Sequence, residues 1–136
     1  MTTEQVVPIG SADDIVIARE AGRDLAGRLG FSLTDLTMIA TAISEVSRNM
    51  TSYAGKGELH LYVESRNRRS VLVVEAVDQG PGIEQLEHAL EDGYSTSGGL
   101  GLGLPGARRL MDEFEIRSVN GTGTTVVMRK WAPPGV

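Results

Sequence analysis

The spacing of apolar residues changes several times along this chain, and the order of those changes restricts the fold. Glu4 to Ile9 is a short apolar run in which Pro8 favours an edge strand, because proline cannot donate to a β-ladder. Two helices are predicted next, one after Ser11 and one after Thr34. The later strands come in pairs joined by turns and do not alternate with helices. That order predicts an α+β fold built as a two-layer sandwich.

The two predicted helices carry different signals. The first is expected to start at Ser11, with Asp14 three residues later as in a capping box, and to close at Gly30. The second carries an apolar stripe about one-third of the circumference wide, which we expect to face a sheet. Its residues are Leu36, Ile39, Ala40, Ile43, Val46 and Met50.

Two hairpins are predicted. In the first, Leu59 to Val63 alternates, Arg66 to Arg69 forms a solvated turn, and a nearly continuous β-branched run from Ser70 leads to Asp78. The second joins strands at Glu115 to Val119 and Thr124 to Trp131 through an Asn-Gly turn. Between the hairpins, Pro105 is expected to open a helix. Its expected apolar face is Ala107, Leu110, Met111 and Phe114, and a short helix over 83–92 is weakly indicated.

Composition limits the classes of function. With 136 residues, 40% of them apolar, we expect one domain over 1–136, with a frayed end at 130–136. A net charge of -5 without a basic stripe argues against nucleic acid as a partner. Without cysteine the chain has no disulfides or thiolate chemistry. Neither an export signal nor an apolar stretch of ~20 residues is found, so we expect a cytoplasmic protein that does not enter a membrane.

Glu45 and Asn49 are the first candidate functional pair. Four residues apart, they lie one turn above each other beside the apolar stripe. Both offer oxygen, which suits Mg²⁺, and the carboxylate could also act on an attacking hydroxyl. Taken alone, the pair is a weak signal and fits a solvated helix face better, because such pairs occur in many helices.

Two glycine-rich segments follow. Asp78 to Ile83, DQGPGI, turns tightly after a buried strand, and its aspartate could accept a hydrogen bond from an amine such as that of adenine. Alone, it is also a plain Asp-x-Gly-Pro turn. Gly98 to Gly106, GGLGLGLPG, sets backbone amides before a helix N-terminus, where phosphate oxygens are favoured.

Gly101 to Gly106 also fits the G-x-G-x-x-G pattern of dinucleotide folds and eukaryotic kinase loops. A dinucleotide site needs a strand directly before the glycines, whereas YSTSG precedes them here. A eukaryotic kinase would need H-R-D and D-F-G motifs, which the chain lacks. We therefore set both interpretations aside.

The order of these segments, with GTGTT at Gly121 to Thr125 after them, resembles the GHKL (Bergerat-fold) ATPase superfamily. The resemblance covers Thr34 to Lys130 and implies a mostly antiparallel mixed sheet with helices on one face. It implies ATP and Mg²⁺ as ligands, with Asn49 on the metal. The implied nucleotide-binding residues are Arg48, Asn49, Asp78, Gly80, Gly82, Ile83, Gly98, Gly99, Leu100, Gly101, Leu102, Gly103 and Thr125, of which Asp78 and Thr125 would serve adenine and the later glycines the phosphates.

Within the superfamily, SEVSRN around Glu45, YAGKGEL from Tyr53 and STSGGLGLGLPGARRLMDEF from Ser95 resemble the anti-sigma-factor serine/threonine kinases, and most closely the RsbT-type switch kinases. This implies phosphoryl transfer from ATP to STAS-domain partners in a stressosome or partner-switching pathway, and then association with a PPM-type phosphatase. Glu45 would be the catalytic base. The roles of Arg48, Tyr53 and Lys56 stay open, although Arg48 or Lys56 could offset γ-phosphate charge. His60 and His88 are interpreted as surface histidines.

Three functions compete at this point. A kinase is favoured because a pure binder would not need Glu45. The alternative from another class is a nucleotide-regulated binding module of anti-sigma type with little phosphoryl transfer, and a third is a hydrolase whose acceptor is water. The sequence does not identify the protein substrates, the oligomeric state or a directly bound sigma factor.

Overall fold

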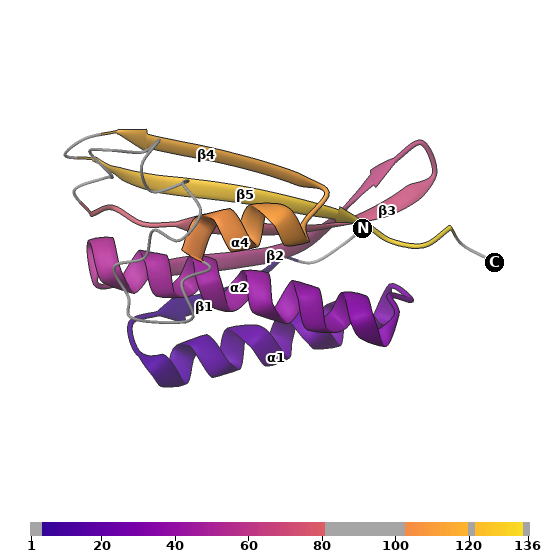
Figure 1. Ribbon diagram of the computed structural model, residues 1–136, viewed down its shortest axis with the longest axis horizontal. Coiled ribbons are helices and arrows are strands. Elements are labelled where there is room, and N and C mark those ends of the chain that lie inside the picture. Colours follow the sequence, from indigo (N-terminus) through magenta and orange to yellow (C-terminus); the bar gives the residue numbers. More distant parts are fainter. Residues whose placement is uncertain (1–3, 81–102, 120–121, 135–136) are drawn as a thin grey trace.

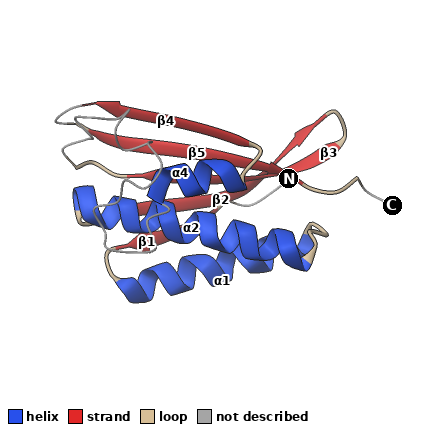
Figure 2. Ribbon diagram, in the orientation of Figure 1, coloured by secondary structure: helices blue, strands red, loops and turns tan. Residues whose placement is uncertain are grey.

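The chain folds into two layers, a five-stranded sheet and a layer of helices over one of its faces (Figure 1). The structure is a computed structural model and describes residues 4–80, 103–119 and 122–134. Its elements are β1 (Gln5–Ile9), α1 (Ala12–Arg28), α2 (Leu33–Ala54), β2 (Gly57–Arg66), β3 (Arg69–Val77), α4 (Gly103–Leu110), β4 (Glu113–Val119) and β5 (Gly123–Trp131). Figure 2 shows the helices together on one side of the sheet. The predicted α+β two-layer fold is confirmed.

The sheet has the strand order β1-β2-β3-β5-β4, and each pairing among the described strands is antiparallel. The expected mostly antiparallel sheet is therefore confirmed, and no parallel pair occurs among the described strands. β1 lies at the edge, as Pro8 predicted, and β3 is central. Val71 to Val74 are buried on both faces of β3, as the β-branched run indicated. This central strand carries Asp78 at its C-terminal end.

α2 lies between α1 and α4, and it packs on the sheet through the predicted stripe. Small residues of α1, Ala18, Gly22 and Ala26, let the two helices approach closely, since a Cβ on Gly22 would clash with Ile43 Cδ1. Ser11 caps α1 as predicted, accepting a hydrogen bond from Asp14 N at 3.3 Å.

The start of α2 corrects the prediction. The helix begins at Leu33, and its cap is Ser32, whose Oγ accepts a hydrogen bond from Asp35 N at 3.2 Å. Thr34 lies inside the first turn. The other end is at Ala54, followed by Gly55 with φ 82°, a conformation that suits glycine.

The C-terminal part of the chain holds two further corrections. α4 begins at Gly103 and ends at Leu110, and Phe114 belongs to β4, where it is opposite Met128 of β5. Phe114 still packs against the core, but it does so from the sheet. The short helix weakly indicated over 83–92 lies outside the described residues.

The chain end is better ordered than expected, because 130–132 do not fray. Lys130 is buried, and its Nζ donates to Leu110 O at 2.9 Å. Ala132 N donates to Ser70 O at 2.9 Å, while the guanidinium of Arg69 donates to Ala132 O. These bonds tie the end of β5 to α4 and to the start of β3.

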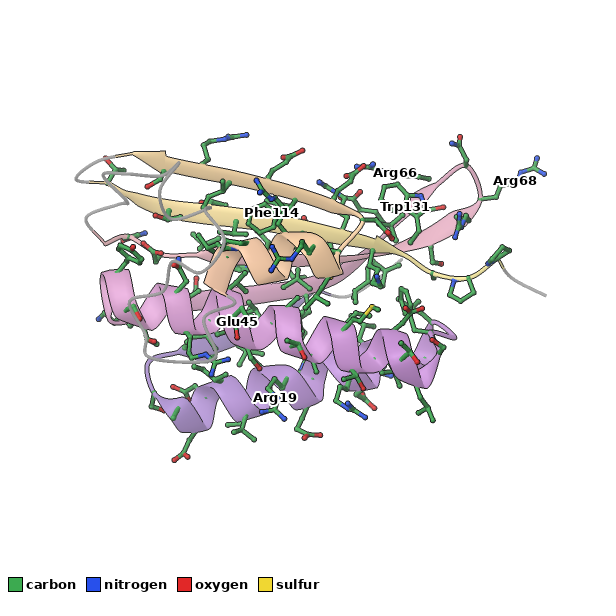
Figure 3. All side chains as sticks on the ribbon, viewed as in Figure 1. Arg19, Glu45, Arg66, Arg68, Phe114 and Trp131 are labelled. Carbon is green, nitrogen blue, oxygen red and sulfur yellow. The ribbon has the colours of Figure 1, made fainter. Side chains whose placement is uncertain are left out.

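The face of the sheet away from the helices carries charged side chains. Arg129 pairs with Glu64, Glu113 and Glu115, and Arg66 lies over the ring of Trp131 at 5.5 Å from its centroid (Figure 3). Burial alone lowers the pKa of Arg129, but the bond to Glu64 and the nearby carboxylates outweigh it, so its pKa is raised. Burial and the hydrogen bond to Glu75 raise the pKa of Tyr62 to about 12.

His60 also lies on this open face, as a partly buried rather than a fully exposed side chain. Its Nδ1 lies 2.9 Å from Glu4 Oε1, and this hydrogen bond raises the pKa of His60 above 6.5 against a smaller effect of burial. In the described part of the chain, no helix is both long and apolar enough to cross a membrane.

Candidate nucleotide site

The site is built at the end of the molecule where α2 and β3 both finish, far from the β2–β3 hairpin tip that bears Arg68 (Figures 1 and 3). Two close contacts hold these ends together. A Cβ on Gly80 would clash with Ala54 Cβ and lie 2.7 Å from Ala54 Cα, and one on Gly57 would clash with Met50 Sδ of α2. Glycine at these positions lets the Asp78 turn and the start of β2 approach the end of α2.

Asp78 is a buried carboxylate with structural bonds of its own. Its Oδ1 accepts hydrogen bonds from Gly80 N at 3.0 Å and Thr124 N at 3.2 Å, and its backbone N donates to Thr124 O at 3.0 Å. The side chain therefore joins the end of β3 to the start of β5. Neither of these side-chain bonds, which come from described residues, uses Oδ2, so as far as the described part of the chain goes this oxygen is left for an amine donor.

A pocket of about 440 Å³ opens beside Asp78. Within the described residues its lining comes from the end of α2, the start of β2 and the Asp78 turn, and not from Glu45 or Asn49. The lining residues are Ala54, Lys56, Gly57, Glu58, Val77, Asp78, Gln79 and Gly80. The pocket thus places Lys56 close to the site, which supports keeping it among the candidates.

Glu45 lies inside α2, one turn before Asn49, and Figure 3 shows it on the half of the helix toward the site. Glu45 is only 6% exposed, whereas Asn49 is partly exposed. The expectation of a functional pair on one flank is compatible with this placement, and the burial of Glu45 argues against a solvated helix face. A buried carboxylate is costly without a partner.

That partner is Arg48, three residues along α2. Its Nη2 donates to Glu45 Oε1 at 2.7 Å. Arg48 Nε is buried and has no hydrogen-bond partner among the residues that the structure describes, and the same is true of Ser47 Oγ. The spacing of Glu45 and Arg48 could have predicted the ion pair, since side chains three apart are neighbours on a helix. The ion pair was not among the sequence-based predictions.

Thr125 does not lie where the resemblance implied. Val126 and Met128 of β5 belong to the core under the helices, so strand alternation puts Thr124 on their side and Thr125 on the open face. Thr124 is buried, and its N is bonded to Asp78. The residue beside Asp78 is therefore Thr124. Two adjacent threonines gave no local signal to choose between them.

The predicted phosphate-binding glycines are only partly described. Gly103 is the first residue of α4 and has φ 50°, and Gly80 follows Asp78 as expected. Gly82, Ile83, Gly98, Gly99, Leu100, Gly101 and Leu102 lie outside the described residues. Among the residues that are described, no three His, Cys, Asp or Glu side chains gather as a metal site.

The sequence and the fold match known proteins. Residues 11–130 match the histidine kinase-like ATPase domain family. The chain is 48% identical to the serine/threonine-protein kinase RsbT of Bacillus subtilis over 132 residues. This match covers 96% of this chain and 98% of that protein. Anti-sigma F factors of Clostridium beijerinckii and Clostridium acetobutylicum are 25% and 28% identical, each over 90% of this chain and over 89% and 88% of their own length.

Among solved structures, the mycobacterial sensor histidine kinase MprB matches with a TM-score of 0.53 and 16% identity, covering 98% of this chain and 100% of that chain. This likeness concerns the fold alone. The chain belongs to the histidine kinase-like ATPase family of ATP-binding domains and, within it, to the group of serine/threonine-protein kinases represented by RsbT.

Proposed function

We propose that this chain phosphorylates serine or threonine residues of STAS-domain partner proteins, using Mg²⁺ and ATP, in a cytoplasmic partner-switching pathway of the stressosome type. The observation that carries the proposal is Glu45, a buried carboxylate one helical turn from Asn49. The similarity to RsbT over nearly the whole chain supports the same activity.

A nucleotide would be held in three places. Asp78 would accept a hydrogen bond from the adenine amine through Oδ2, with Thr124 beside it in place of Thr125. The glycines 98–103 would donate backbone amides to phosphate oxygens at the start of α4. Asn49 would hold Mg²⁺ through its carboxamide oxygen, since Mg²⁺ prefers oxygen ligands. When bound, the ion would offset negative charge on the phosphates.

Glu45 would take the proton in the transfer step. As its carboxylate accepts the hydrogen of the partner's hydroxyl, that hydroxyl oxygen bonds to the γ-phosphorus. The bond from the γ-phosphorus to the β–γ bridging oxygen breaks, and ADP leaves. Holding the base inside the protein keeps it oriented, which is the main contribution that a side chain can make to this reaction.

The test is transfer of label from γ-labelled ATP to a purified STAS-domain protein in the presence of Mg²⁺. Glu45→Gln keeps the shape of the side chain but removes the base, so transfer should fall by about 100-fold or more. Arg19→Gln, on the exposed face of α1, is the matched control and should transfer at the wild-type rate. If transfer persists in Glu45→Gln, Glu45 is not the catalytic base.

One later event belongs to the same proposal. After phosphorylating its partner, the chain would bind a PPM-type phosphatase, and the test is co-elution of the two proteins only once the STAS protein is phosphorylated. The alternative is a nucleotide-regulated binding module, which the similarity to anti-sigma F factors favours. Direct binding of a sigma factor, with no label transferred to any STAS protein, would favour this alternative.

A further inference from the structure

The two members of the Glu45–Arg48 ion pair differ in their freedom to move. The Glu45 side chain is 7% exposed and the Arg48 side chain 40% exposed. Glu45 is therefore fixed among its neighbours, whereas Arg48 reaches it from the surface. If the pair opens, Arg48 is the side chain that moves, since its long stem can turn toward solvent without disturbing the core.

The pair as it stands does not suit a base. Arg48 Nη2 donates to Glu45 Oε1 at 2.7 Å, so the carboxylate already accepts a charge-assisted hydrogen bond from a cation. A partner hydroxyl would have to compete with the guanidinium. Removing the guanidinium without replacement would leave a buried carboxylate alone, which is costly.

Arg48 is itself only partly satisfied. Its Nε–H is buried without a hydrogen-bond partner, and the bond to Glu45 uses Nη2 alone. The Nε and Nη2 hydrogens form a fork that fits two oxygens of a phosphate group. A phosphoryl group near Arg48 can thus satisfy both donors, whereas Glu45 satisfies one.

We infer that Arg48 is a positioning residue that pairs with Glu45 until a γ-phosphate is present, then turns to that phosphate and leaves the Glu45 carboxylate free for the partner's hydroxyl. The inference rests on the proposed kinase function. It adds that ATP, and not ADP, releases the base.

Nucleotide binding tests the inference without any phosphoryl transfer. Affinities for ADP and for the non-hydrolysable β,γ-imido analogue of ATP are measured by calorimetry with Mg²⁺. Arg48→Met should weaken the affinity for the analogue by about tenfold or more, the scale of a charge-assisted hydrogen bond, and change the affinity for ADP by less than about twofold. Arg48→Lys keeps the charge without the fork, so its affinity for the analogue should lie between those of the wild type and Arg48→Met. Arg19→Met on α1 should change neither affinity.

Glu45→Gln gives the sharper result. Releasing Arg48 from its ion pair should raise the affinity for the analogue by about threefold, as expected for a partly exposed pair, and leave the affinity for ADP unchanged. In the Arg48→Met background, Glu45→Gln should produce no tightening. This dependence on Arg48 separates release of the guanidinium from simple removal of a negative charge.

Two results would overturn the inference. One is equal weakening of ADP and the analogue by Arg48→Met while thermal unfolding shows a folded variant. The other is tightening by Glu45→Gln that survives in the Arg48→Met background. Failure of the kinase proposal looks different, because a wild-type chain that transfers no label to STAS-domain proteins leaves the binding ratios interpretable.

Discussion

Asp78→Asn should separate the structural role of this side chain from its proposed role in binding adenine. Asp78 Oδ1 accepts bonds from Gly80 N and Thr124 N, while Oδ2 takes part in neither. Asparagine can keep an oxygen at the Oδ1 position and place its amide at the Oδ2 position. The joint between β3 and β5 then keeps both bonds, but the pocket receives a donor where adenine needs an acceptor.

The magnitudes follow from these two bonds. Exchanging a charged for a neutral acceptor should cost about 1–2 kcal/mol of unfolding free energy, whereas Asp78→Ala removes the acceptor of one buried and one partly buried N–H group and should cost about 2–5 kcal/mol. For a chain of this length about 1 kcal/mol shifts Tm by about 4 °C. Losing the bond to the adenine amine should weaken ADP by about 10- to 100-fold in the asparagine variant.

The assay pairs thermal unfolding with titration of ADP and of inosine diphosphate, in which a carbonyl replaces the adenine amine. The wild type should prefer ADP, since Asp78 cannot donate to that carbonyl. Asp78→Asn should lose most of this preference because its amide can donate. A wild type that binds both nucleotides equally, or a folded variant that keeps the full preference for ADP, would refute the assignment of Asp78 to the adenine amine.

Three further predictions concern parts of the fold outside the pocket. Arg68 sits in a two-residue turn at φ 66° after Asn67 at φ 51°, so Arg68→Gly should raise the unfolding free energy by about 0.5–1 kcal/mol in urea titrations. An equal gain in Arg68→Ala would exclude backbone strain as the cause. The raised pKa of His60 means that its bond to Glu4 contributes fully below pH 6.5 and fades as pH rises through the folded-state pKa. Stability should fall across that window by at most about 0.5 kcal/mol, since both side chains are partly exposed, and Glu4→Gln should remove the fall; an unchanged slope would contradict this. A chain ending at Ala132 should match the wild type, whereas one ending at Lys130 should lose about 2 kcal/mol or more, because it lacks the bonds that Trp131 and Ala132 make to Asp112, Ser70 and Arg69. Equal stability of the two truncated chains would instead support the original prediction that the chain is frayed from residue 130.

The parts of the fold that follow from local patterns were predictable. Alternation and turn chemistry identified both hairpins, and Pro8 identified the edge strand. The start of α2 was placed two residues late because Ser32 and Thr34 both suit a cap, and the exposed Leu33 adds nothing to the apolar period.

Three other errors share one physical origin, which is pairing between distant segments. Phe114 continues the spacing of a helix face, yet it lies in the sheet because β4 pairs with β5. Thr124 and Thr125 are indistinguishable until the register of β5 against Val77 assigns them to opposite faces. Lys130 looks solvated until the end of α4 brings Leu110 O within reach of its Nζ. Local spacing carries no information on these contacts.

The site also shows why glycine and aspartate are needed together at the end of β3. Gly80 lets the turn touch Ala54, and Asp78 ties the same turn to Thr124, so α2, β3 and β5 meet at one joint. Residues of that joint, Ala54, Asp78 and Gly80, line the pocket. A ligand that bonds to Asp78 therefore adds to contacts that already hold α2 in place, and α2 carries Glu45, Arg48 and Asn49. We therefore expect occupancy of the proposed adenine pocket to be coupled, through the C-terminal end of α2, to the geometry of the proposed catalytic residues.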